Sequence, residues 1–496
     1  MMSYQDPPQR KLFYMGINLD KRIRKDHPLR KIRELIDFDF IYKEVKDKYG
    51  YNGNESVPPP IILKLMLLLV LYNVRSEREL METLEERLDW LWFLDFDLDT
   101  EIPNHSVLSK ARKRWGEETF RGFYERVVWQ CVEKGLVDGR KIFVDSSLIQ
   151  ADASNNSVVD TQSLKRYLNE SYKELEKRLE EEMEDEEGND DESGGVNSRY
   201  ISTTDPDASI VRTSGKAKLR YQTHRAVDDA YEVITATGVT PGDVNEAHMM
   251  LGLVDSHQQN TESSVETVVA DSKYGTISNY LDCYDRGIRA HIPDLKEVQG
   301  KSGLRGDIFS DEMFIYDNET DTYTCPSGKK LMRKSLHMSR QSIDYGALRS
   351  DCGVCDLRSQ CTRNKAGRTV KRHLRQEELD YMRALARTTI SRDDIKTRQH
   401  LMERSFARAK RYGYDRARWR GLWRVRIQEY LIASIQNIQI LLKYGTDPRI
   451  AVGVAKVDGE LNGKITEVFK DVKKFLLDNF LLLKSGVEHS LVLKIC

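Results

Sequence analysis

Short β-rich runs alternate with helical patterns between residues 141 and 292, and this order limits the possible folds more than any other feature. The strand candidates lie at 142–145, 221–228, 231–240, 266–271 and 288–292. Only two residues separate the second run from the third, which predicts a β-hairpin. Helical patterns follow at 245–258 and 278–286. The sequence therefore predicts a mixed α/β layer in which paired strands precede strands joined through helices.

The first 140 residues favour helices. An apolar run at 61–72 is interrupted by Lys64 and is shorter than the roughly 20 residues of a membrane span, so we expect a buried helix. Ser76 and Glu79 form a Ser-x-x-Glu capping box, which predicts a second helix ending near Leu88. A further short helix is expected after Ser106 as its N-cap. This helix carries Lys110, Arg112, Lys113 and Arg114. These basic residues could contact DNA or form a solvated face of a helical bundle.

Charge is segregated along the chain although the totals nearly cancel. Lys and Arg number 78 and Asp and Glu number 79, so net charge excludes no class of partner. The acidic stretch 174–195 predicts a solvated helix that passes into a flexible linker at about 160–200. Residues 396–426 contain 11 Lys and Arg against two acids, with interleaved Tyr412, Tyr414, Trp419 and Trp423. This composition favours DNA, with the rings available to bases, over an arginine-rich protein interface.

Four cysteines cluster in the order Cys325, Cys352, Cys355 and Cys361. Their C-x26-C-x2-C-x5-C spacing predicts a structural Zn²⁺ site, with an iron–sulfur cluster or four unligated thiols as alternatives. The start of the chain shows no signal peptide, and we expect the protein to be cytoplasmic.

Two carboxylates follow short apolar strands. Asp145 ends the run IFVD and Asp271 ends VVAD. Side chains at strand ends in an α/β sheet converge at one edge, and two carboxylates placed there repel each other unless a cation joins them. Asp152, Asp282 and Asp294 are local competitors for the same role. We expect Asp145 and Asp271 to bind Mg²⁺ or Mn²⁺, which prefer oxygen ligands.

A third acid lies on the helix predicted over 396–413. Met402, Phe406 and Ala409 form an apolar stripe that should pack on the core. Glu403 lies on the adjacent face with Lys410, and the next stripe is Arg404, Arg408 and Arg411. The helix would place Glu403 beside the sheet and the arginines against a DNA backbone. The alternative is an ordinary surface pair between Glu403 and a neighbouring cation.

These segments resemble a known family. VDSSLIQADAS, TDPDAS, YQTHRAVDD, VTPGDVNEAHMM, VVADSKYGT and ERSFARAKRYGYDRARWRG, with NHSVLSKARKRW nearer the N-terminus, are similar to motifs of DDE transposases of bacterial insertion sequences. The resemblance implies a ribonuclease-H-like core with Asp145, Asp271 and Glu403 as catalytic metal ligands and Lys410 as a phosphate contact. A tyrosine and an arginine that related transposases carry before the glutamate are replaced by Lys396 and Gln399, with Arg398 one place off.

The resemblance also implies an organisation and a reaction. We expect a helical DNA-binding region at 1–140, the first part of the core at 141–292, a cysteine-rich insertion at 293–394, the glutamate-bearing part at 395–445 and a tail at 446–496. Water activated by metal would cut at an element end, and the freed 3′ hydroxyl would attack target DNA. The partners would be double-stranded DNA with terminal inverted repeats, target DNA and a second copy of the chain. A non-catalytic DNA-binding descendant and a stand-alone nuclease are the alternatives.

Overall fold

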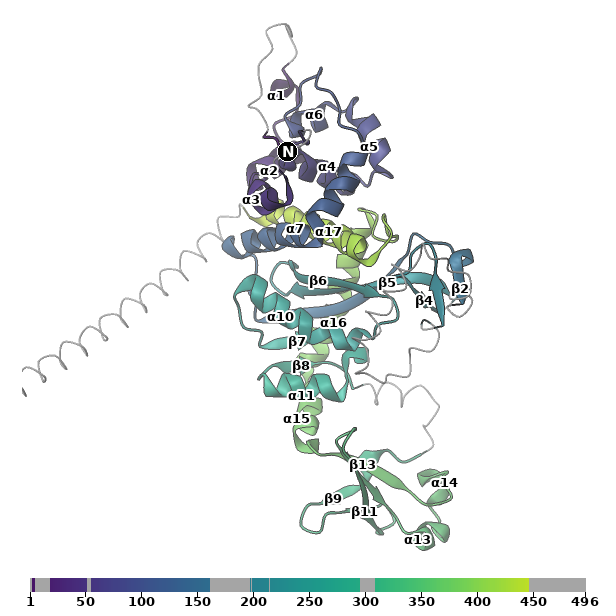
Figure 1. Cartoon of the computed structure of the whole chain (residues 1–496). Coiled ribbons are helices and arrows are strands. Elements are labelled where there is room, and N and C mark those ends of the chain that lie inside the picture. The colour runs from purple at the N-terminus through teal and green to yellow at the C-terminus, as the bar shows by residue number, and fades with distance from the viewer. Residues whose placement is uncertain are drawn as a thin grey trace, which may run out of the picture.

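A computed structural model of the chain describes residues 2–4, 18–50, 55–160, 197, 199–213, 215–294 and 308–445. Helices of the N-terminal region lie at one end of the molecule, a central sheet lies in the middle and a small second sheet lies at the other end (Figure 1). The expected acidic linker lies almost entirely outside the described residues, as does the tail at 446–496.

The N-terminal region is helical, as predicted. Its helices are α1 (Leu19–Arg22), α2 (Pro28–Leu35), α3 (Phe40–Val45), α4 (Pro59–Leu71), α5 (Glu77–Leu84), α6 (Leu88–Leu94) and α7 (Ser106–Glu133). Helix α4 is buried on all sides, and Lys64 is neutralised there by Asp95 at 3.2 Å. The N-cap at Ser76 is confirmed, because its hydroxyl accepts a hydrogen bond from the amide of Glu79.

Helix α7 differs from the predicted short helix. It continues for 28 residues, with a kink at Gly116, whose φ of 73° suits a residue without a Cβ. The predicted N-cap is one residue off, because His105 occupies that position. The Asn104 side chain accepts a hydrogen bond from the amide of Ser106, so an Asx turn opens the helix.

The central sheet is mixed, as the strand order predicted. Its strands are β1 (Lys141–Gln150), β4 (Ser209–Val211), β5 (Lys218–Asp228), β6 (Ile234–Pro241), β7 (Thr267–Val269) and β8 (Arg289–His291). They lie in the order β4-β5-β1-β7-β8, and β6 pairs with β5 as the predicted hairpin. Strand β1 is antiparallel to β5 and parallel to β7. The connecting helices are η4 (Glu246–His248), α10 (Met249–Thr261), η5 (Ser272–Tyr274) and α11 (Ile277–Asp285).

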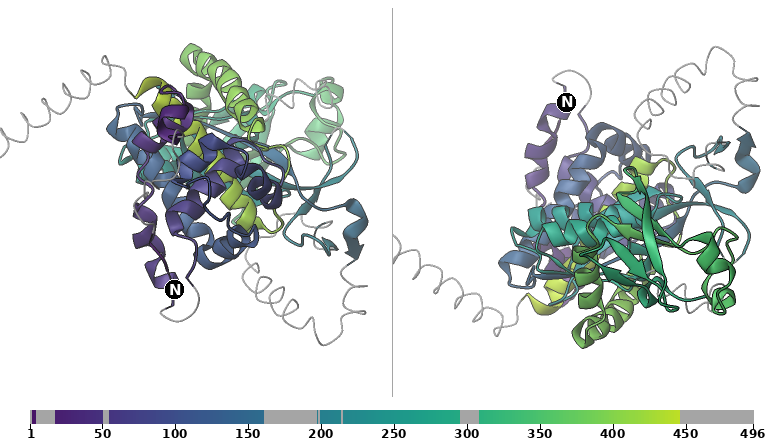
Figure 2. Two further views of the ribbon diagram at one scale, coloured as in Figure 1. Left: turned by 90° about the horizontal axis from the view of Figure 1, so that it is seen from above. Right: turned by 90° about the horizontal axis from the view of Figure 1, so that it is seen from below.

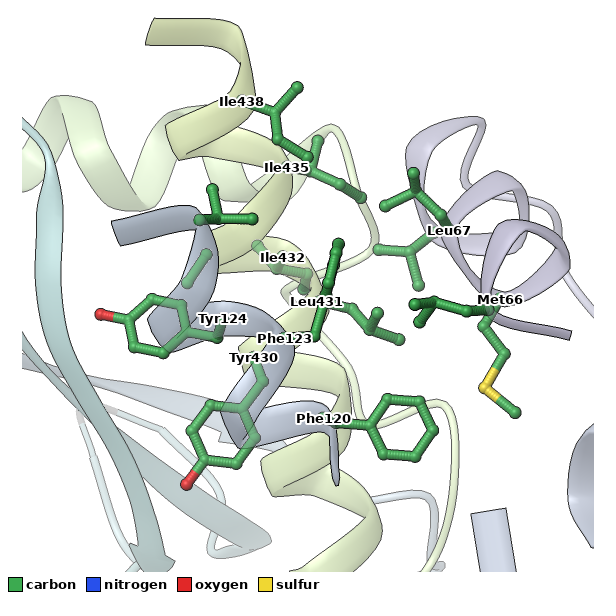
Figure 3. Close-up of a cluster of buried hydrophobic side chains, with 14 of the residues drawn as sticks. Met66, Leu67, Phe120, Phe123, Tyr124, Tyr430, Leu431, Ile432, Ile435 and Ile438 are labelled. Atoms are coloured by element: carbon green, nitrogen blue, oxygen red, sulfur yellow. The ribbon is translucent and has the colours of Figure 1, made fainter. Parts of the chain in front are cut away.

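Two long helices join the N-terminal region to the sheet. They are α16 (Thr389–Lys410) and α17 (Leu422–Tyr444). Apolar residues of α17, among them Leu431 and Ile435, pack against α4 and α7 in one continuous hydrophobic core (Figure 3). The predicted stripe on α16 is confirmed, since Met402, Phe406 and Ala409 are buried. The helical region and the sheet are therefore fixed to each other through α17.

The segment with the cysteine cluster forms a separate small sheet. Its strands, in the order β13-β12-β11-β10-β9, are β9 (Ile315–Asp317), β10 (Thr322–Thr324), β11 (Lys330–His337), β12 (Ser342–Gly346) and β13 (Thr369–His373). Helices α13 (Arg349–Gly353) and α14 (Arg358–Cys361) lie beside it, and α15 (Gln376–Ala386) leads back to the core. Seen from below, this sheet lies in front of the central one (Figure 2).

The remaining elements are short: η1 (Lys46–Lys48), η2 (Asn155–Ser157), η6 (Asp311–Met313) and the two-stranded sheet of β2 (Val158–Asp160) and β3 (Tyr200–Ser202). Within the described part of the chain, no helix combines the length and the apolar character that crossing a bilayer requires.

Candidate active site

Asp145 and Asp271 occupy equivalent positions on neighbouring parallel strands. The parallel pairing of β1 with β7 ends at Phe143 and Val269, and each aspartate lies two residues further on. The prediction that β1 ends at Asp145 is wrong, because the strand continues to Gln150 through its pairing with β5. Asp145 nevertheless lies at the edge where β7 has ended, directly after the buried residues Ile142–Val144, and its carboxylate is partly exposed there.

The environment of Asp145 disfavours its ionised form. Burial raises the pKa of its carboxyl to about 6, and the negative charges of Asp271 and Glu246 act in the same direction. Arg398, on α16, opposes this shift by donating to Asp145 Oδ2 at 2.8 Å. The amide of Ser146 donates to the other oxygen at 2.9 Å. One carboxylate is thus held by a buried guanidinium cation and lies close enough to two other acids to feel their charge.

Asp271 caps the short helix η5. Its carboxylate accepts a hydrogen bond from the amide of Lys273 at 2.9 Å. The side chain of Lys273 extends to Glu246, where Nζ lies 2.6 Å from Oε1, and this contact raises the pKa of the lysine. The loop that carries Asp271 is therefore tied to η4 through Lys273.

Glu246 is a functional candidate that the sequence reasoning did not identify. It is only 7% exposed, and its second oxygen accepts from Gln222 Nε2 at 2.9 Å. The motif containing it, VTPGDVNEAHMM, contributed to the family resemblance, but a glutamate beside an Asn N-cap has no spacing that distinguishes it from a helix-start residue.

Glu403 is not brought to the two aspartates in this structure. It lies on the exposed side of α16, and its carboxylate accepts a hydrogen bond from Gln399 Nε2 at 3.2 Å. Among the described residues, no three or more His, Cys, Asp or Glu side chains form a group that could hold a metal ion. The residue of α16 that contacts Asp145 is Arg398. The sequence did not predict this contact, because the family pattern has its arginine one position later, where this chain has Gln399.

A buried hydrogen-bonded group supports β1 next to Asp145. The hydroxyl of Ser146 lies 2.6 Å from both His224 Nδ1 and Tyr274 Oη, and His224 Nε2 lies 2.8 Å from Thr240 Oγ1. Burial lowers the pKa of His224 to about 4, so the imidazole is neutral at pH 7. These contacts link β5, β1 and η5 and fix the backbone on which the two aspartates stand.

The competing aspartates have partners elsewhere. Asp152 pairs with Arg416 at 2.7 Å, Asp282 accepts from Ser278 at 3.1 Å, and Asp294 pairs with Arg383 at 2.7 Å.

The predicted arginine row lines a cleft of about 880 Å³ with residues of α2 and the end of α17. Arg404 and Arg408 both pair with Glu232, a residue of the β5–β6 turn with a φ of 63°. Arg411 also lines the cleft, whereas Lys410 pairs with Asp415 at 3.5 Å. In this structure Glu232 therefore neutralises two of the arginines that line the cleft.

Three of the four basic residues at positions 110–114 of α7 are exposed, as a DNA contact requires, whereas Arg112 is buried. Lys110 and Lys113 are open to solvent, and the Arg114 guanidinium lies 4.6 Å from the ring centroid of Tyr49. The expectation that the rings after α16 serve bases is wrong for Tyr414. That ring is 1% exposed in the core, since it packs against Phe406.

The four clustered cysteines line one small cavity beside β10 and β11. Burial raises the pKa of the Cys361 thiol, and the three other cysteines shift it in the same direction. The amide of Lys329 donates a hydrogen bond to Cys325 Sγ at 3.3 Å. No disulfide joins these four described residues. They converge, but they do not form a group that could hold a metal within the described residues.

Comparisons with known proteins agree on one class. Residues 17–114 match a family described as "Transposase domain (DUF772)", and residues 324–442 match "Transposase DDE domain". No curated protein matches the chain. A cryo-EM structure of a piggyBac transposase synaptic complex with hairpin DNA is 9% identical over 86% of this chain and 84% of that chain, with a TM-score of 0.25, which is too low to carry an argument.

Both matched segments therefore belong to transposase domain families. These two matches support a DDE transposase of the insertion-sequence type.

Proposed function

We propose that this protein cuts DNA at the ends of an insertion sequence and joins the cut ends to target DNA, using a divalent metal ion. The observation that carries the proposal is the placement of Asp145 and Asp271 side by side where the β1–β7 pairing ends, in a chain of the DDE transposase family. The mixed order of the central sheet supports assignment to the ribonuclease-H-like group.

The donor set at this edge fits Mg²⁺ or Mn²⁺ in part. Asp145 and Asp271 offer the hard oxygen atoms that these ions prefer, and each is partly exposed. Glu403 is the third ligand that the family resemblance implies, and Glu246 is the acid already near Asp145. When bound, such ions activate an attacking oxygen and stabilise the leaving one.

The chain's own residues prepare this edge for a cation. Arg398 supplies a positive charge at this edge, and this charge lowers the pKa of the Asp145 carboxyl against the effect of burial. A metal ion must therefore compete with the guanidinium for Asp145. Lys273 orients Asp271 through its amide, and its side chain neutralises Glu246.

Basic residues outside this edge would hold DNA. Arg404, Arg408 and Arg411 line the cleft beside α16, with Lys410 near it, and Lys110, Lys113 and Arg114 extend from α7. Guanidinium and ammonium groups of this kind bind phosphates without reading sequence. Because two element ends must be joined in one complex, we expect a homodimer to act.

The substitution Asp145→Asn tests the active site. We expect it to abolish cleavage of end-containing DNA in Mg²⁺ and to leave binding in a gel-shift assay largely intact. Asp282→Asn is the matched control, because this carboxylate lies on α11 and accepts a hydrogen bond from Ser278 of the same helix. Cleavage by the Asp145→Asn protein at the wild-type rate would remove Asp145 from the site.

The same assay separates the two alternatives. A non-catalytic DNA-binding protein would shift the DNA and produce no cut with any divalent ion. A stand-alone nuclease would cut without producing strand-transfer joints, which sequencing of the products detects.

We also propose that the small second sheet binds a structural Zn²⁺ through Cys325, Cys352, Cys355 and Cys361. Their convergence on one cavity and the N–H···S contact to Cys325 support this. Zinc would have to draw the thiols closer together, because as they lie here they form no group among the described residues that could hold a metal. Elemental analysis of the purified chain tests the proposal, and fewer than one zinc per two chains would contradict it.

A further inference from the structure

We propose that a basic cavity between the N-terminal helices and the segment after α16 binds a phosphate of the DNA backbone. The cavity has a volume of about 350 Å³. Its polar lining includes Arg75, Arg78, His105, Arg112 and Arg418. None of the residues assigned above to the active site or to the cleft beside α16 lines it. The choice of DNA as the ligand rests on the proposed function, whereas the anion site itself does not.

Arg112 is the central observation. It is 3% exposed, and one of its terminal nitrogens donates to the carboxylate of Glu77. Its Nε and Nη1 are buried and find no hydrogen-bond partner within the described parts of the chain. The guanidinium lies 4.0 Å from the ring centroid of Trp419, which holds it in place. A buried charged donor without an acceptor is costly, and the oxygens of a phosphate are strong acceptors for a guanidinium.

Arg418 also lines the cavity and repeats part of this pattern. One of its terminal nitrogens donates to the carbonyl of Val74 at 2.5 Å, which ties the loop after α16 to the α4–α5 turn. Its Nε is also buried and has no partner among the residues that the structure describes. Two arginines from distant parts of the chain thus line one cavity, and each carries a buried donor without a partner among the described residues.

The rest of the lining adds positive charge. Arg75 and Arg78 are exposed at the start of α5. Glu77 is the single carboxylate among the described lining residues, and it is already bound by Arg112 and by Trp419 Nε1. The N-terminal end of α5 contributes its partial positive charge at the same place. The cavity is therefore lined by four guanidinium groups and one carboxylate that already has partners, so it favours a strongly anionic ligand.

The size of the cavity favours a polymer phosphate over a free one. Its volume is on the order of ten times the share of one water molecule in the liquid, which leaves room for the sugars on either side of a phosphodiester. Arg112 belongs to the matched residues 17–114 and Arg418 to the matched residues 324–442. A DNA phosphate bound here would therefore connect the two transposase domains.

The test uses the full chain and two ligands. The first is inorganic phosphate, added by isothermal titration calorimetry in a chloride buffer without divalent ions. The second is a 20-base-pair duplex, whose affinity is measured as a function of salt. The variants are the exposed double change Arg75→Gln/Arg78→Gln and the buried change Arg112→Gln. Arg121→Gln is the control, since this arginine on α7 is exposed and lies outside the cavity.

We expect the wild-type chain and the control to bind phosphate saturably, and the double variant to bind it at least tenfold more weakly. The slope of log affinity for DNA against log salt should fall by about 0.9 for each DNA phosphate that the variant no longer neutralises. Equal phosphate binding by the double variant and the control overturns the site. Weakened phosphate binding with an unchanged DNA slope overturns DNA as its ligand. A wild-type chain that binds DNA but never cuts it refutes the proposed function and leaves this site standing.

Discussion

Glu429→Gln should destabilise the core strongly, because it would leave a buried cation without its anion. Arg225 and Glu429 are 0% and 1% exposed in their side chains. They form two parallel hydrogen bonds, from Arg225 Nε at 2.7 Å and from Nη2 at 3.1 Å. Removing one partner of a pair buried this completely costs about 3–5 kcal/mol. Glutamine keeps one acceptor oxygen, so we expect a loss near the lower end, about 3 kcal/mol.

Urea unfolding followed by tryptophan fluorescence measures this loss. The double variant Arg225→Met/Glu429→Leu is the matched control, because replacing both charges with apolar side chains of similar size is often neutral. We expect it to recover most of the stability that Glu429→Gln loses. A loss below about 1 kcal/mol in the single variant would show that water or another group solvates Arg225, and the reasoning would fail.

Three further predictions concern the site. The pKa of Asp145 is raised from 3.8 to about 6, so its ionisation destabilises the folded state. In EDTA, the free energy of unfolding should therefore fall by up to about 3 kcal/mol as the pH rises from 4 to 7. The folded state binds this proton more tightly than the unfolded one, so the stability difference from Asp145→Asn must change over that range, and a constant difference refutes the burial argument. Glu232→Gln should tighten DNA binding severalfold in gel shifts by freeing its two arginine partners; unchanged or weaker binding would contradict this. Glu246→Gln should slow cleavage by about 10–100-fold with little change in the urea midpoint, and wild-type cleavage would reduce this residue to a packing role.

Much of the fold could be predicted because local patterns decide it. The β5–β6 hairpin follows from two β-rich runs with almost no residues between them, and α5 follows from a Ser-x-x-Glu box. The length of α7 could not be predicted, because a glycine in the middle of a helical pattern signals an end, whereas here Gly116 only bends the helix. The end of β1 was misplaced for a different reason. Its pairing with β5 is a long-range contact that continues after β7 has stopped.

The candidate site was only partly predictable, since its contacts come from distant segments. The equivalence of Asp145 and Asp271 followed from two similar strand ends in the sequence. The position of Arg398 against Asp145 depends on the rotation of α16, which no local pattern sets. Lys273 lies next to Asp271 in the sequence, but its partner Glu246 comes from a separate short helix.

The rotation of α16 connects the buried arginine to the site. Arg225 donates to Ser405 Oγ at 3.2 Å, so Ser405 faces the sheet. Arg398 lies seven residues earlier, which is nearly two full helical turns, and it therefore faces the sheet on the same stripe. Glu403 lies five residues after Arg398, about 140° further round the helix, and it faces outward. The Arg225–Ser405 contact sets a rotation of α16 that directs Arg398 toward Asp145 and Glu403 away from it. For Glu403 to share a metal site with the two aspartates, α16 would have to rotate and break the Ser405 contact.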